Sequence, residues 1–192
     1  MTETQWNESD NAISMMEFAF EKQGIGSDST QHRMGYRMNS GNVKGDSQFE
    51  TAMHRFYIAC CRQIWPLLPD KESRKGVEIA ERWLNGNAPD SEMNDCDYYV
   101  EGAAFGIDYR TSSDQVDRWI SDVDAIPDSE LNSLLHSQDA DGRDSYQLLK
   151  TAAYFAHYSI MYPAINPKGM PPKSYHQFLS PDLLRQYIKY AE

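Results

Sequence analysis

The sequence predicts an all-α protein, a single irregular bundle of about seven helices that forms one domain over residues 1–192. Three observations favour this class. Apolar residues recur at helical spacing in several segments, most clearly in residues 49–86. Pro, Gly and Asp stand where such segments begin and end. No segment keeps the apolar–polar alternation that is typical of a strand.

The first part of the chain predicts one short helix and a loop. Apolar residues from Ile13 to Phe20 favour a helix over about residues 11–23, with Ser9 or Asp10 as its cap and Gly24 as its stop. Residues 24–47 contain five glycines and five serines or threonines without an apolar period. We therefore expect a flexible loop over residues 24–47.

Residues 49–86 predict a helical hairpin that anchors the fold. The apolar stripe of its first helix leaves four polar residues mostly outside it, namely Glu50, His54, Arg55 and Arg62. Pro66 and Pro69 end this helix, Asp70 is the expected cap of the second, and Gly86 occupies the position of a left-handed C-terminal residue.

A further helix is expected to start at Pro89 and Asp90. The residues that fit its buried face are Met93, Cys96, Tyr99 or Val100, Ala103 and Ile107. Gly102 and Gly106 stand four residues apart, and we expect them to allow a neighbouring helix to approach closely.

The remaining elements follow from apolar runs and prolines. Short amphipathic helices are predicted over residues 113–123 and after Pro127, and the most apolar run, residues 146–162, predicts a central helix. Residues 163–181 contain five of the nine prolines and predict an extended, non-helical strap. Ser180 and Pro181 then begin a last helix.

Three motifs in the sequence resemble a known group of proteins. They are R-F-x-x-A-C-C-R-x-I-W from Arg55, L-P-D-x-x-S-R from Leu68 and V-E-x-A-E-R from Val77. Together with the starting segment Met1–Trp6 and the segment Ser180–Arg185, they resemble uncharacterised bacterial proteins abundant in planctomycetes. The resemblance implies a helical fold and a bacterial cytosolic setting, and it implies no catalytic residue.

No motif in the sequence predicts catalysis, a metal site or a cofactor. Cys60, Cys61 and Cys96 lack the spacing of zinc ligands or of a redox pair, and we expect small buried thiols. The loop from Ser137 to Leu148 resembles a calcium-binding loop but has Leu148 where the bidentate Glu belongs. We therefore expect no catalytic residue, no metal ligand and no cofactor.

The charge of the chain is the main functional signal. The net charge is −11, and fifteen of the 29 acidic residues lie between Asp90 and Asp144 with only three basic ones. Such a segment repels phosphate, so we expect no nucleic acid or membrane as a partner. We expect instead a non-catalytic adaptor or immunity-type module that binds a basic protein through Asp114, Asp117, Asp122 and Asp124.

The alternative is an enzyme or small-ligand binder with a pocket near His157, Tyr154 and Tyr158. His157 lies within an apolar helix, where burial would demand a hydrogen-bond partner. The chain shows no apolar run long enough to span a bilayer and no export signal, so the expected location is the cytoplasm.

Overall fold

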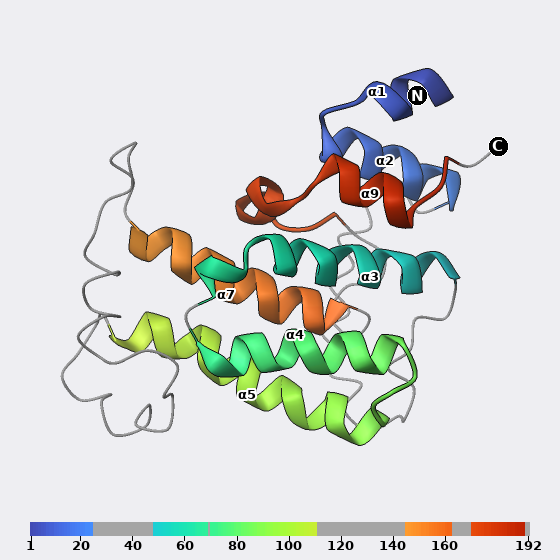
Figure 1. Cartoon of the computed structure of the whole chain (residues 1–192). Coiled ribbons are helices and arrows are strands. Elements are labelled where there is room, and N and C mark those ends of the chain that lie inside the picture. The colour runs from blue at the N-terminus through green and yellow to red at the C-terminus, as the bar shows by residue number, and fades with distance from the viewer. Residues whose placement is uncertain (25–47, 69, 111–144, 163–169, 191–192) are drawn as a thin grey trace. The chain divides into compact units, whose positions relative to one another are not determined.

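The computed structural model of the chain describes residues 1–24, 48–68, 70–110, 145–162 and 170–190 (Figure 1). Every regular element in these ranges is a helix, which confirms the all-α prediction. The expected loop over 24–47, except Gly24, and the helices expected over 113–123 and after Pro127 lie outside the described residues. Within the described part, none of the helices is long and apolar enough to cross a membrane.

The chain divides into two compact units. Unit 1 comprises Met1–Gln63 and Met161–Glu192, and unit 2 comprises Ile64–Ile160. The boundary falls inside the predicted hairpin, so its first helix α3 (Gln48–Gln63) belongs to unit 1 and its second helix α4 (Lys71–Leu84) to unit 2. A single domain over residues 1–192 stays a prediction.

Unit 1 begins with a six-residue helix, α1 (Glu3–Glu8), that the hydrophobic pattern does not predict. It forms because Thr2 and Gln5 make a capping box. Thr2 Oγ1 accepts from the Gln5 amide at 3.2 Å, and Gln5 Oε1 accepts from the Thr2 amide at 2.7 Å. The helix buries Trp6.

Helix α2 (Ala12–Lys22) has Asn11 as its N-cap, so the expected cap at Ser9 or Asp10 is wrong. Asn11 Oδ1 accepts from the amides of Ile13 at 3.0 Å and Ser14 at 3.1 Å, which satisfies two free donors of the first turn. The chain leaves the helix through Gly24, whose φ of 69° is the left-handed conformation that glycine adopts without strain.

Helix α3 is buried over a wider arc than its apolar stripe predicts. Met53, Phe56 and Tyr57 are fully buried, as expected. Glu50 and His54 are buried as well, so the expectation that they lie outside the buried face is wrong. The centroid of the His54 ring lies 6.3 Å from that of the Tyr162 ring.

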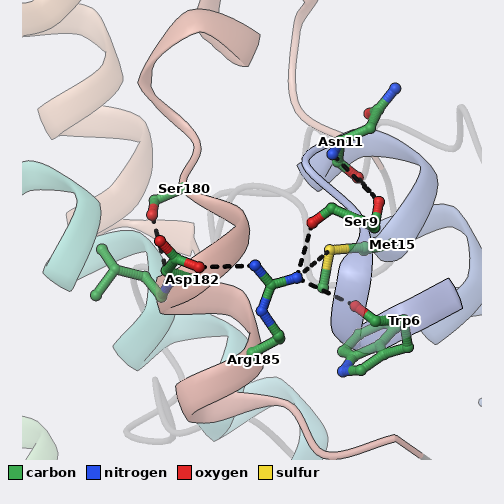
Figure 2. Close-up of polar contacts among 8 residues, drawn as sticks. Trp6, Ser9, Asn11, Met15, Ser180, Asp182 and Arg185 are labelled. Atoms are coloured by element: carbon green, nitrogen blue, oxygen red, sulfur yellow. Dashed lines mark hydrogen bonds and ion pairs between the residues drawn. The ribbon is translucent and has the colours of Figure 1, made fainter. Parts of the chain in front are cut away.

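Arg185 ties the last helix of unit 1, α9 (Pro181–Tyr187), to the first two helices (Figure 2). Its Nη1 donates to the carbonyl oxygens of Trp6 at 3.1 Å and Ser9 at 2.7 Å, and it lies 3.7 Å from Met15 Sδ. Carbonyls in the last turn of a helix have no intrahelical donor, so Arg185 caps the C-terminus of α1. Its Nη2 donates to Asp182 Oδ1 at 2.7 Å.

The predicted non-helical strap contains a 3₁₀ helix, η2 (Lys173–Phe178). Prolines allow this because Pro171 and Pro172 precede the helix, where no amide donor is needed. Ser180 caps α9 as predicted, with its hydroxyl accepting from the Leu183 amide at 3.3 Å. Residues 163–169 lie outside the described part.

Unit 2 begins with the short 3₁₀ helix η1 (Trp65–Leu67), which leads to α4. Asp70 caps α4 as predicted, accepting from the Glu72 amide at 2.7 Å. At the other end Gly86 has the predicted left-handed φ, 75°. Its amide donates to Trp83 O at 2.9 Å and the Asn87 amide donates to Arg82 O at 2.7 Å, the two bonds of a Schellman motif.

Helices α4, α5 (Asp90–Arg110) and α7 (Ser145–Ile160) pack against one another to form the core of unit 2. Helix α4 approaches α5 and α7 closely at Gly76. A Cβ placed there would lie 2.8 Å from Ile160 Cδ1 and closer still to Val100 Cγ2, so any larger residue would force these side chains to move. The expected close approach at Gly102 is wrong, because Gly102 is exposed and a Cβ there meets nothing within 4 Å.

We predict that Gly76→Ala lowers the free energy of unfolding by about 1–3 kcal/mol, because the added methyl group overpacks the junction of the three helices. Gly102→Ala is the matched control. It adds the same methyl group to an open helical position, and it should raise stability by about 0.5–1 kcal/mol. Urea denaturation followed by circular dichroism measures both changes. A Gly76→Ala variant as stable as Gly102→Ala would contradict the packing described here.

Candidate functional site

Helix α5 has a buried face and an exposed face of different chemistry. Its inner face is buried in unit 2 and consists of Met93, Cys96, Asp97, Val100, Ala103 and Ala104. The opposite side, which we call the outer face, consists of Asn94, Asp95, Tyr98, Tyr99, Glu101, Gly102 and Phe105. At 3.6 residues per turn these seven positions form one continuous strip along the helix.

The outer face exposes three large aromatic side chains. Tyr98 is 72% exposed, Tyr99 52% and Phe105 42%. The rings of Tyr98 and Tyr99 meet edge to face with centroids 5.7 Å apart. Gly102 stands between Tyr98 and Phe105 and leaves the strip flat there. The sequence left open whether Tyr99 or Val100 lies on the buried face, and Val100 is the one that does.

The acidic residues of α5 differ in whether they are already engaged. Asp90 Oδ1 accepts from Trp83 Nε1 at 2.8 Å, and Glu92 pairs with Arg82. Neither Asp95 nor Glu101 forms a hydrogen bond or an ion pair within the part of the chain that the structure describes. These two carboxylates flank Tyr98 on the outer face, and their charges are therefore available to a partner.

One cation already contacts this face. Lys75 Nζ of α4 lies 5.5 Å from the centroid of the Tyr99 ring, a distance at which the ring attracts a cation. The same ammonium group lies 3.6 Å from Glu72. A lysine held between a carboxylate and a tyrosine ring shows how a basic side chain fits this combination of groups.

The predicted site residue Tyr154 lies at one end of the outer face. Its ring meets the Phe105 ring edge to face, with centroids 5.8 Å apart. Tyr158, one turn further along α7, is buried. The two tyrosines that the sequence predicts as ligand-binding residues therefore differ: Tyr154 borders the outer face, and Tyr158 lies in the core.

The predicted site residue His157 pairs with Asp97 on the inner face. His157 Nε2 and Asp97 Oδ1 are 3.0 Å apart, and the side chains are 17% and 9% exposed. The expectation that His157 needs a hydrogen-bond partner is confirmed. Asp97 is the only side-chain partner recorded for His157 among the described residues. The pair joins α5 to α7 and fixes how α5 is rotated about its axis.

The cysteines are free, and all three are buried, as the sequence predicts. Burial raises the pKa of the Cys60 thiol to about 12. Burial also raises the pKa of Cys96 to about 12, with the negative charge of Asp97 as a smaller cause. Neutral buried thiols are poor nucleophiles. Within the described ranges, no three His, Cys, Asp or Glu side chains gather in a way that could hold a metal ion.

The predicted partner-binding residues Asp114, Asp117, Asp122 and Asp124 lie outside the described residues. Sequence reasoning missed that Tyr98 and Phe105 are exposed together on one face of α5. The sequence pattern could have predicted their exposure, because helical spacing places both residues on the side of the helix opposite Cys96 and Val100.

Comparisons with protein-family models, with curated proteins and with solved structures find no match to this chain. The resemblance to the bacterial helical proteins therefore stays a prediction, and the roles of residues are inferred from the geometry of the chain itself.

We predict that Asp97→Ala lowers the free energy of unfolding by about 1–3 kcal/mol, because it leaves His157 partly buried without its partner. Asp95→Ala, two residues earlier on the exposed side, is the matched control and should change stability by less than about 0.5 kcal/mol. Thermal or urea unfolding distinguishes the two. Equal effects at positions 95 and 97 would contradict a structural role for the Asp97–His157 pair.

Proposed function

We propose that this chain is a non-catalytic helical module that binds a basic segment of another protein on the outer face of α5. The observation that supports this most strongly is the exposure of Tyr98, Tyr99 and Phe105 side by side on one helix. Exposed apolar patches of this kind commonly mark binding surfaces, and tyrosines are enriched among the residues that contribute most to binding.

Charge complementarity supports a basic partner. Helix α5 contains six acidic residues and one basic residue, and the whole chain has a net charge of −11. Asp95 and Glu101 have no recorded partner in the described part of the chain and stand beside Tyr98. A lysine or arginine of a partner would form an ion pair with either carboxylate and lie against a tyrosine ring, as Lys75 lies against Tyr99.

The two kinds of group contribute differently to such a complex. The aromatic rings supply buried apolar area, which governs affinity and the rate of dissociation. The carboxylates at the edge of the strip attract the partner before contact, which governs the rate of association and its dependence on salt. The inner face keeps the rings and the carboxylates on the same exposed side. It does so because packing at Gly76 and the Asp97–His157 pair hold α5 in one orientation.

The alternative function, an enzyme or ligand-binding protein at His157, stays a prediction. His157 and Asp97 form a pair of the kind that takes part in acid–base catalysis. The same pair has a structural explanation, since it joins two helices of the core of unit 2.

We predict that selection of a displayed library of random 16-residue peptides on the wild-type chain enriches sequences of net positive charge that also contain apolar residues. The combined variant Tyr98→Ser and Phe105→Ser should bind the enriched peptides at least about tenfold more weakly, because it removes two exposed rings. Asp95→Asn with Glu101→Gln should slow association and weaken its dependence on salt. Biolayer interferometry at two salt concentrations measures these quantities.

The control for the charge variant is Glu78→Gln, which removes an exposed carboxylate from α4 instead of α5. It should leave peptide binding within about twofold of wild type. Circular dichroism confirms that each variant is folded. Enriched peptides without basic residues, or equal binding by the Tyr98 and Phe105 variant, would refute the proposed function.

A further inference from the structure

Unit 1 contains a cavity that none of the expectations from sequence includes. Its volume is about 300 Å³, and it is formed by α1, the end of α2, the start of α3 and the end of α9. Four aromatic side chains line it, namely Trp6, Phe18, Phe49 and Tyr187. The volume is at the lower end of the range for ligand pockets, which suits a molecule of one or two fused rings.

The charged side chains that line the cavity are both basic, although the whole chain is acidic. Lys22 and Lys189 line it, and none of the described residues that line it is acidic. The whole chain has 29 acidic and 18 basic residues. Within the described ranges, neither Lys22 nor Lys189 forms an ion pair. Lys22 Nζ lies 5.5 Å from the centroid of the Phe18 ring.

Helix dipoles explain part of this arrangement but not all of it. Lys22 is in the last turn of α2 and Lys189 follows the end of α9, where a positive charge is favourable without any ligand. The dipoles do not require that both lysines border the same aromatic cavity. Gln48 and Phe49, in the first turn of α3, also line it. The positive end of the α3 dipole lies there, and the carboxylate of Glu50 in the same turn offsets part of it, so the two lysines supply the main attraction for an anion.

Contacts within unit 1 hold the walls of the cavity in place. The centroids of the Trp6 and Phe18 rings lie 6.0 Å apart. The Phe18 ring also stacks on the Tyr190 ring, with centroids 5.5 Å apart. The Phe49 ring meets the Phe20 ring edge to face, with centroids 5.5 Å apart. Arg185 ties the helix that carries Tyr187 to the helix that carries Trp6 (Figure 2). A cavity with fixed walls binds a rigid ligand with little loss of conformational freedom.

We propose that this cavity binds a small planar aromatic carboxylate. The rings of Phe18, Phe49 and Trp6 accommodate the aromatic part of the ligand. The ammonium groups of Lys22 and Lys189 pair with its carboxylate. The proposal concerns unit 1 only and does not depend on the function proposed for α5.

The test uses two probes that differ in charge and hardly at all in shape, indole-3-acetate and indole-3-acetamide. Isothermal titration calorimetry of the full chain should show that the carboxylate binds at least about tenfold more tightly than the amide. The variant Lys22→Gln with Lys189→Gln should weaken binding of the carboxylate by at least about tenfold and leave binding of the amide within twofold. Lys75→Gln, which removes an exposed ammonium group from unit 2, should change neither.

A second variant tests the cavity itself. Ala52 lines the cavity, and Ala52→Leu should weaken binding of both probes by partly filling it. Circular dichroism verifies that the variant is folded. The proposal is overturned if neither probe binds the wild-type chain at millimolar concentration, if both bind equally well, or if the double lysine variant binds the carboxylate as tightly as wild type does.

Discussion

The close approach of three helices at Gly76 is the constraint on which unit 2 depends. The side chains of Val100 and Ile160 occupy the space that any other residue at position 76 would need. This contact commits one side of α5 to the core, and the Asp97–His157 pair at 3.0 Å fixes the rotation of the helix. A helix held in this way must turn its remaining side outward, which leaves Tyr98 and Phe105 exposed. The carboxylates of Asp95 and Glu101 lie on the same side and form no ion pair within the described residues. The exposed aromatic strip is therefore a consequence of the packing on the opposite side of α5.

Polar contacts at both ends of α1 fix this helix within unit 1. Helix α1 has six residues, and isolated helices of this length are unstable in water. Its two ends are satisfied by different parts of the chain, the N-terminus by the capping box of Thr2 with Gln5 and the C-terminus by Arg185. Because Arg185 comes from α9, it joins segments almost 180 residues apart in the sequence. The same contact positions Trp6 and Tyr187 in the wall of the cavity.

The sequence was sufficient to predict elements whose signals are local. The cap at Asp70, the left-handed Gly86 and the start of α9 at Ser180 all follow from residues within one turn, and all three predictions are confirmed. Features that depend on another helix were not predictable. Gly76 and Gly102 are both glycines in helical segments, and only the neighbours of Gly76 distinguish them. His157 was expected to have a partner, but its identity as Asp97 depends on the packing of α7 against α5. The cavity brings together residues from four helices, and no spacing in the sequence relates them.

Mapping of the contact surface by nuclear magnetic resonance tests most directly whether the outer face of α5 binds a basic partner, as we propose. A basic peptide selected on the wild-type chain is titrated into the ¹⁵N-labelled protein, and the shift of each backbone amide is followed. The account predicts that the largest shifts fall on α5 between Asn94 and Phe105, with small shifts along α1 and α2. Large shifts confined to unit 1, or shifts along α5 no larger than those elsewhere, would contradict it.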